Sequence, residues 1–169
     1  MKVLRPEPLT KAGFAPYGDV VSMEGAGHFT INQGYAERFN DLCRVDVAEQ
    51  SGEINISIVE AMPRPRPIAI WLMERHPLGT QIFHPMQDRP WLVVVCSDVR
   101  TPDSYRAFLA DGRQGVNYAR NIWHHPLLVL DAHSLFLVVD RKGPGNNLEE
   151  VELDEGLSIS LDLPALHGG

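Results

Sequence analysis

The stretch MERHPLGTQIF, at residues 73–83, carries side chains whose types and spacing suit chemistry. Glu74 and His76 lie two residues apart, so on a strand both side chains point to the same face of the sheet. A tight turn at residues 77–79 would then bring Gln81 back toward the same space. Carboxylate and imidazole groups gathered in this way can bind nickel, zinc, iron or manganese, and they can exchange protons near neutral pH.

A second stretch, GVNYARNIWHHP at residues 115–126, concentrates polar and aromatic groups between two predicted strands. Such a concentration at a strand connection indicates a binding site more often than a structural requirement. His124 and His125 are neighbours, so on a strand only one of them can face the same cavity as Glu74, and we choose His124. The other candidate residues of this stretch are Asn117, Tyr118, Arg120 and Trp123.

Two interpretations of these residues remain open. The first is a metal site, whose candidate ligands are Glu74, His76, Gln81 and His124. An amide is a poor ligand for a transition metal, so Gln81 weakens this interpretation. The second is an ion pair of Glu74 with Arg75 or Arg120. His76 is then a hydrogen-bonded pocket residue without a metal. The remaining histidines lack a partner in the sequence and are interpreted as surface or satisfied core residues: His28, His84, His133 and His167.

Short apolar runs rich in Val, Ile and Leu must position these groups. They lie at residues 68–72, 92–96, 127–130, 135–139 and 157–161, and turn residues separate them. Residues 105–110 allow a helix, but the hairpin signal Asp111-Gly112 that follows favours a strand. Strands of this length and spacing predict an all-β sandwich or barrel.

In two further segments, polar and apolar residues alternate along the chain. Ile54, Ile56 and Ile58 alternate with polar residues, which is typical of a half-buried strand. Residues 28–32 also alternate, a turn at residues 33–34 follows, and residues 35–39 suit an exposed strand or a loop.

The N-terminal part predicts one short helix, capped by Thr10 and stopped before Pro16. We expect a single domain over residues 1–163 and a disordered tail at residues 164–169. Cys43 and Cys96 lie in apolar surroundings without metal-ligand spacing, which predicts free core thiols.

The composition excludes several classes of function. A formal net charge of −7, with acidic residues spread along the chain, argues against nucleic-acid binding. The N-terminus lacks a signal-like apolar run, and no stretch is long enough to span a bilayer, so we expect a cytoplasmic protein without a membrane partner.

The candidate residues also follow a family pattern. Glu74, His76 and Gln81 fall at the spacing of the first cupin motif, and His124 falls at the place of the second. Glu and Gln stand at two of the usual ligand positions. The segments that carry a narrower resemblance are ERHPLGTQ at 74–81, QGVNYARNIWHHPL at 114–127, APYGDV at 15–20, INQG at 31–34, RFNDL at 38–42 and VVDR at 138–141. In these segments the chain resembles the ureidoglycolate lyase family, from about residue 8 to about residue 160.

The resemblance implies a cupin-type jelly-roll β-barrel, also called a double-stranded β-helix, with a short N-terminal helix. It implies an enzyme that splits (S)-ureidoglycolate into glyoxylate and urea, a late step in allantoin and purine breakdown that releases nitrogen. It also implies a divalent metal, nickel in this family, with no organic cofactor, and a homodimer. Two alternatives stay open: another small-acid cupin enzyme such as an epimerase or dioxygenase, and a non-catalytic cupin that binds a small molecule.

The reaction suggests roles for the candidate residues. We expect His76 or His124 to take the substrate's hydroxyl proton. Arg120 is preferred over Arg75 for the carboxylate, because on a regular strand Arg75 faces away from Glu74. Tyr118 is counted with these histidines as a catalytic residue, which can hydrogen-bond urea as it leaves, and the further groups expected to bind the substrate or to wall the pocket are Asn117, Gln81 and Trp123.

Overall fold

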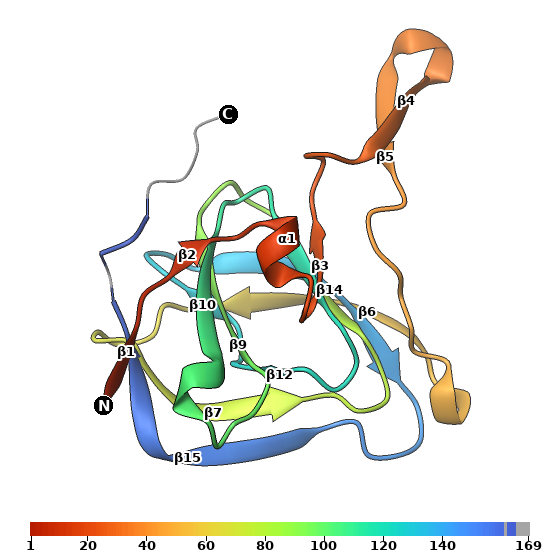
Figure 1. The fold of residues 1–169 in the computed structure, drawn as a ribbon. Helices are drawn as coiled ribbons and strands as arrows, with labels where there is room; N and C mark the ends of the chain where they lie inside the picture. The colour runs from red at the N-terminus through yellow and green to blue at the C-terminus, as the bar shows by residue number, and fades with distance from the viewer. Residues whose placement is uncertain (161, 165–169) are drawn as a thin grey trace.

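The computed structural model describes residues 1–160 and 162–164. Two curled sheets surround the interior of the molecule (Figure 1). The larger sheet has eight strands: β1 (Lys2–Leu4), β15 (Glu149–Ile159), β7 (Ala69–Arg75), β12 (Trp123–His124), β9 (Trp91–Cys96), β10 (Tyr105–Ala110) and β2 (Glu7–Pro8) in spatial order, with β13 (Leu128–Val129) also paired to β9. The smaller sheet has five: β3 (Gly18–Val21), β11 (Gly115–Tyr118), β8 (Gln81–Pro85), β14 (Ser134–Lys142) and β6 (Glu53–Ala61). The prediction of a mainly β, cupin-like fold is confirmed.

Within residues 1–160 and 162–164, helical structure is limited to short segments. The α-helix is α1 (Lys11–Phe14), and the 3₁₀ turns are η1 (Asn32–Gly34), η2 (Glu49–Ser51) and η3 (Pro102–Ser104). Thr10 caps α1 as predicted, because its hydroxyl oxygen accepts a hydrogen bond from the Gly13 N–H at 3.0 Å. Among the described residues, none of the helices has the length and hydropathy needed to cross a bilayer.

The core lies on both faces of β9. Trp91, Val93 and Val95 pack into the interior between the two sheets, together with Phe108 and Phe136. The alternate residues, Leu92, Val94 and Cys96, pack into a second cluster on the other face. Because β9 is buried on both faces, all of its residues are apolar, and its sequence is the continuous run WLVVVC.

The turn at residues 77–79 connects the two sheets. It follows β7 of the larger sheet and precedes β8 of the smaller one. The end of β7 and the start of β8 therefore meet at one rim of the interior, and polar side chains can face one another there.

Strand β6 forms as predicted, but the predicted burial of its isoleucines is wrong. Ile54, Ile56 and Ile58 are 52%, 68% and 59% exposed, whereas the polar Asn55 and Ser57 between them are half-buried. Asn55 faces inward because its amide donates a hydrogen bond to Asp140 on the neighbouring strand β14 at 3.0 Å. The isoleucines consequently lie on the outer face of the sheet.

A hairpin of β4 (Gly27–Ile31) and β5 (Ala36–Asn40) projects from the body (Figure 1). It confirms the predicted strand and turn near residues 28–34, and it resolves residues 35–39 as mainly strand. Its apolar side chains are exposed, Phe29 at 49% and Tyr35 at 91%.

The remaining predictions have mixed outcomes. Residues 105–110 are the strand β10, as predicted. The last strand starts earlier than predicted, because the acidic residues from Glu149 onward already belong to β15. Cys96 is buried and Cys43 is only half-buried, so both are free but only Cys96 is a core thiol. Leu161, His167 and the predicted tail beyond Pro164 lie outside the described residues.

Candidate metal centre

Three side chains converge at the rim where the sheets meet. Glu74 lies near the end of β7, His76 follows that strand directly, and His124 of β12 is the cross-strand partner of Glu74. The Glu74 Oε1 atom is 3.4 Å from His124 Nε2 and 3.8 Å from His76 Nε2. The two imidazole rings are tilted, with their centroids 5.2 Å apart. The sequence prediction that His124 joins Glu74 and His76 is confirmed in its geometry.

Backbone hydrogen bonds determine which imidazole nitrogens are available. His76 Nδ1 lies 2.8 Å from the Asn147 carbonyl, and His124 Nδ1 lies 3.0 Å from the Ile122 carbonyl. A carbonyl only accepts, so each Nδ1 carries the proton and each neutral ring presents an Nε2 lone pair. Both Nε2 atoms are buried and lack a hydrogen-bond partner among the described residues.

The residues fit a divalent metal ion. Two Nε2 lone pairs and a carboxylate oxygen are all acceptors, so a cation between them removes an otherwise unfavourable arrangement. The three donor atoms lie within 4.8 Å of one another. Histidine ligands in metal sites typically donate their other N–H to a backbone carbonyl or a carboxylate, as both histidines do here.

The pKa shifts of His76 and Glu74 favour the metal-binding forms of these two groups near neutral pH. Burial, followed by the nearby imidazole of His124, lowers the pKa of His76, so this ring is neutral at pH 7. Burial by itself would raise the pKa of Glu74, but the imidazoles of His124 and His76 beside it have the larger combined effect, and the pKa is lowered. Glu74 is therefore a carboxylate, which is the form that binds cations.

Tyr118 and Gln81 extend the cluster into the interior. The Tyr118 ring stacks on His124 with centroids 4.0 Å apart and an angle of 11° between the planes. Burial strongly raises the pKa of Tyr118, so its hydroxyl stays a neutral donor. Gln81 is the cross-strand partner of Tyr118, which places both side chains on one face of the smaller sheet.

Asp140 is a functional candidate that the sequence reasoning missed. One of its carboxylate oxygens accepts from Gln81 Nε2 at 3.3 Å, and the other accepts from Asn55. A carboxylate only accepts, so it orients the Gln81 amide with the nitrogen toward itself. The Gln81 Oε1 atom is then left buried without a partner in the described part of the chain. A lone acidic residue after the apolar run VV was the available signal in the sequence.

Other predicted site residues lie away from the cluster. Trp123 is next to His124 and lies on the opposite face of β12. There the Arg75 guanidinium stacks over its ring, with Cζ 4.4 Å from the ring centroid. Arg75 pairs with Glu149. Asn117 also faces away from Tyr118, and its amide nitrogen donates to the Arg44 carbonyl at 2.9 Å.

Arg120 lies beside the turn that follows His76. Its guanidinium donates to the Pro77 carbonyl at 3.0 Å and pairs with Glu49. The alternative interpretation, an ion pair of Glu74 with Arg75 or Arg120, is therefore wrong: Glu74 faces the histidines, and both arginines have other partners.

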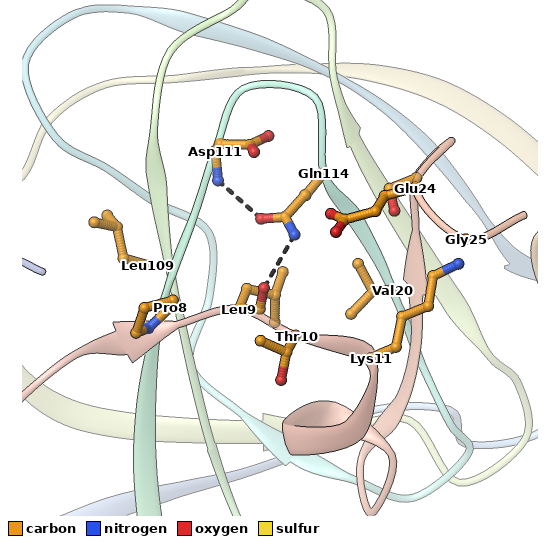
Figure 2. Close-up of a pocket in the computed structure, with 11 residues that line it drawn as sticks. Pro8, Leu9, Thr10, Lys11, Val20, Glu24, Gly25, Leu109, Asp111 and Gln114 are labelled. Carbon is orange, nitrogen blue, oxygen red and sulfur yellow. Dashed lines mark hydrogen bonds between the residues drawn. The ribbon is translucent and has the colours of Figure 1, made fainter. Parts of the chain in front are cut away.

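A separate pocket of ≈ 320 Å³ lies between the N-terminal segment and the β10–β11 connection (Figure 2). It shares no residue with the metal cluster. The Gln114 side chain in it donates to the Leu9 carbonyl at 3.0 Å and accepts from the Asp111 N–H at 3.1 Å. Both ends of this amide are satisfied, so Gln114 braces the fold at this position.

Comparison with known proteins identifies the family of this chain. The model of the ureidoglycolate lyase family matches residues 1–160. Ureidoglycolate lyase 1 of Rhizobium meliloti is 53% identical over 154 residues, which cover 90% of this chain and 91% of the relative. Ureidoglycolate lyase of Burkholderia cepacia is 49% identical over 98% of this chain and 94% of its own length. That of Pseudomonas syringae pv. tomato is 46% identical over 96% of each chain. The chain belongs to the ureidoglycolate lyase family.

Proposed function

We propose that this protein is a ureidoglycolate lyase, which splits (S)-ureidoglycolate into glyoxylate and urea during allantoin and purine breakdown. The observation that carries the proposal is the cluster of Glu74, His76 and His124 in a chain of this family, with both Nε2 atoms directed at the carboxylate. A buried set of acceptors without donors is costly for the fold, so its presence favours a function in binding.

The reaction sets clear chemical demands. The hydroxyl on the central carbon loses its proton as the C–O bond becomes a carbonyl. The C–N bond breaks, its electron pair stays on nitrogen, and this nitrogen takes up one proton to give urea. The enzyme must therefore accept one proton, deliver one proton and hold the substrate's carboxylate.

A divalent ion held by Glu74, His76 and His124 would supply positive charge to the developing alkoxide and lower the pKa of the hydroxyl. We propose nickel as this ion, on the basis of the family resemblance. Gln81, the fourth ligand suggested by the sequence, has an unpartnered Oε1 suited to accepting an N–H of the ureido group.

Proton transfer needs a group other than an Nε2 atom that binds metal. The Nδ1 of each histidine is already bonded to a carbonyl, so a histidine that binds the ion through Nε2 has no free nitrogen left as a base. We propose Asp140 as the group that accepts the hydroxyl proton and returns it to the leaving nitrogen. Its negative charge opposes the lowering of the His76 pKa, and its carboxylate accepts a hydrogen bond from Gln81.

Arg120 is the proposed partner of the substrate's carboxylate. Its side chain is 30% exposed, and its guanidinium lies on the carbonyl of Pro77, directly after His76. In the complex, the substrate's carboxylate would take the place of Glu49 beside this guanidinium. Arg120 would then hold the substrate at the rim of the site, next to the turn that follows His76.

Measurement of both products tests the proposed function. Purified protein with (S)-ureidoglycolate should release one glyoxylate and one urea per substrate, above the rate of a protein-free control. Release of ammonia in place of urea would indicate a hydrolase, and no glyoxylate above the control would contradict catalysis.

We also propose a cytoplasmic homodimer. The outer face of β6 and β14 exposes Ile54, Ile56 and Ile58 beside Leu135 and Leu137, and β6 is the edge strand of its sheet. A contiguous apolar patch on an exposed edge favours association. A second copy suits it, because a two-fold contact pairs the same apolar patch on both chains.

A further inference from the structure

Asn147 makes two contacts with the segment that begins at His76. Its backbone carbonyl accepts from His76 Nδ1 at 2.8 Å, and its side-chain Oδ1 accepts from the Leu78 N–H at 2.7 Å. The first contact selects the tautomer of His76 whose Nε2 lone pair faces Glu74. The second fixes the backbone two residues further on. Asn147 thus holds both the ring and the turn that carries it.

Arg141 anchors the loop on which Asn147 lies. It is only 7% exposed, and its guanidinium donates to the backbone carbonyls of Pro144 at 2.7 Å, Glu49 at 2.9 Å and Gln50 at 3.2 Å. No acidic side chain in the described part of the chain forms an ion pair with it. This buried cation therefore uses its donors to join two loops, residues 49–50 and 143–147.

The surroundings of Arg141 leave little freedom for the guanidinium. A Cβ atom at Gly52 would collide with Arg141 Nε, and one at Gly79 would come within 2.8 Å of Arg141 Cβ. Only glycine fits at positions 52 and 79. An ammonium group has three donors on a flexible stem, so lysine cannot reproduce the planar fork that reaches both loops.

We propose that Asn147 and Arg141 are positioning residues for His76 as a metal ligand. Arg141 fixes the loop through Pro144, and Asn147 at the end of this loop sets the tautomer and direction of the imidazole. This inference rests on the proposed metal-dependent function. Partners of ligating histidines typically contribute about ten- to hundredfold to metal affinity, and the indirect effect of the Asn147 side chain is expected at the lower end of this range.

The test uses Asn147→Ala with Asn146→Ala as its matched control. Among the residues that the structure describes, the Asn146 side chain accepts only from the exposed Leu148 N–H, at 3.3 Å, so its loss leaves His76 untouched. Two readouts are needed: the imidazole ¹⁵N signals of His76 in metal-free protein, and the dissociation constant of Ni²⁺ by calorimetry. Neither uses ureidoglycolate, so failure of this inference is separable from failure of the proposed lyase function.

Asn147→Ala keeps the backbone carbonyl at His76 Nδ1 and removes only the Oδ1 acceptor of the Leu78 N–H. Because the segment that presents this carbonyl to His76 is then held less firmly, we expect Ni²⁺ binding to weaken about tenfold and the second tautomer of His76 to become populated. Asn147→Asp keeps the Oδ1 acceptor and should stay within about threefold of wild type, as should Asn146→Ala. Arg141→Lys should shift both readouts in the direction of Asn147→Ala, while Lys142→Met on the same strand should not. Wild-type affinity together with an unchanged Nδ1–H tautomer in Asn147→Ala would overturn the inference.

Discussion

Replacing Glu74 by glutamine separates a metal ligand from a structural ion pair. The substitution keeps the shape of the side chain and removes its charge. The Glu74 side chain is 17% exposed and faces two Nε2 atoms at 3.4 and 3.8 Å. In the metal-free protein these are three acceptors together, and the amide nitrogen of glutamine can donate to one Nε2. We therefore expect Glu74→Gln to gain about 0.5–1.5 kcal/mol of unfolding free energy, the net value of one hydrogen bond.

The effect on function should have the opposite sign. Loss of a direct ligand exceeds the effect of losing one of its supporting partners, so Ni²⁺ affinity should fall by more than about hundredfold. The kcat/KM for ureidoglycolate should fall with it. A structural ion pair predicts the reverse: removing one partner of a buried pair costs about 3–5 kcal/mol of stability and leaves metal binding unchanged.

Urea unfolding of the metal-free protein, followed by calorimetry with Ni²⁺, distinguishes the two cases. The expected stabilities differ by several kcal/mol, while the slope m is only about 1–3 kcal/mol per molar urea. The unfolding midpoints therefore separate clearly. A large drop in the midpoint of Glu74→Gln with wild-type Ni²⁺ affinity would refute the assignment of Glu74 as a ligand.

Two further predictions follow from the proposed roles. Asp140→Asn keeps the shape of the side chain but removes the proton acceptor and one of its two accepting oxygens, so kcat should fall by about 10²–10⁴ while Ni²⁺ affinity stays near wild type; a wild-type kcat would remove Asp140 from proton transfer. Ile58→Glu places a charge in the exposed apolar patch of β6, so if the proposed dimer forms through this patch, sedimentation should show a dimer for the wild type and a monomer for the variant. An unchanged dimer would locate the interface elsewhere.

Strand alternation explains what the sequence could predict about the site. His124 and His125 point to opposite faces, and Glu74 and His76 to the same one, because side chains alternate along an extended chain. These relations are local, and the register of β12 against β7 then places His124 opposite Glu74. Alternation therefore indicated that only one of the two histidines could face the site, and the register of β12 against β7 shows that it is His124.

Alternation does not tell which face of a strand is inside. In β6 the isoleucines are outside and Asn55 is inside, because an inward carboxylate on β14 accepts its amide. A hydrophobic pattern predicts that the two faces differ, and the burial follows only when the neighbouring strands are known.

The residues that support the site depend on contacts between distant parts of the chain. Asn147 bonds His76 across 71 positions, and Arg141 bonds Glu49 across 92. Both lie in or next to a Gly- and Pro-rich loop whose sequence indicates only a turn. The same limit applies to Arg120, whose carbonyl and carboxylate partners appear only in the folded chain.

Metal reconstitution tests the central claim, a catalytic divalent ion on Glu74, His76 and His124, most directly. Protein stripped by a chelator and dialysed should lose release of glyoxylate and urea from (S)-ureidoglycolate. The rate should return in proportion to added Ni²⁺ and level off at one ion per chain. Full activity in protein shown by elemental analysis to be metal-free would contradict the account.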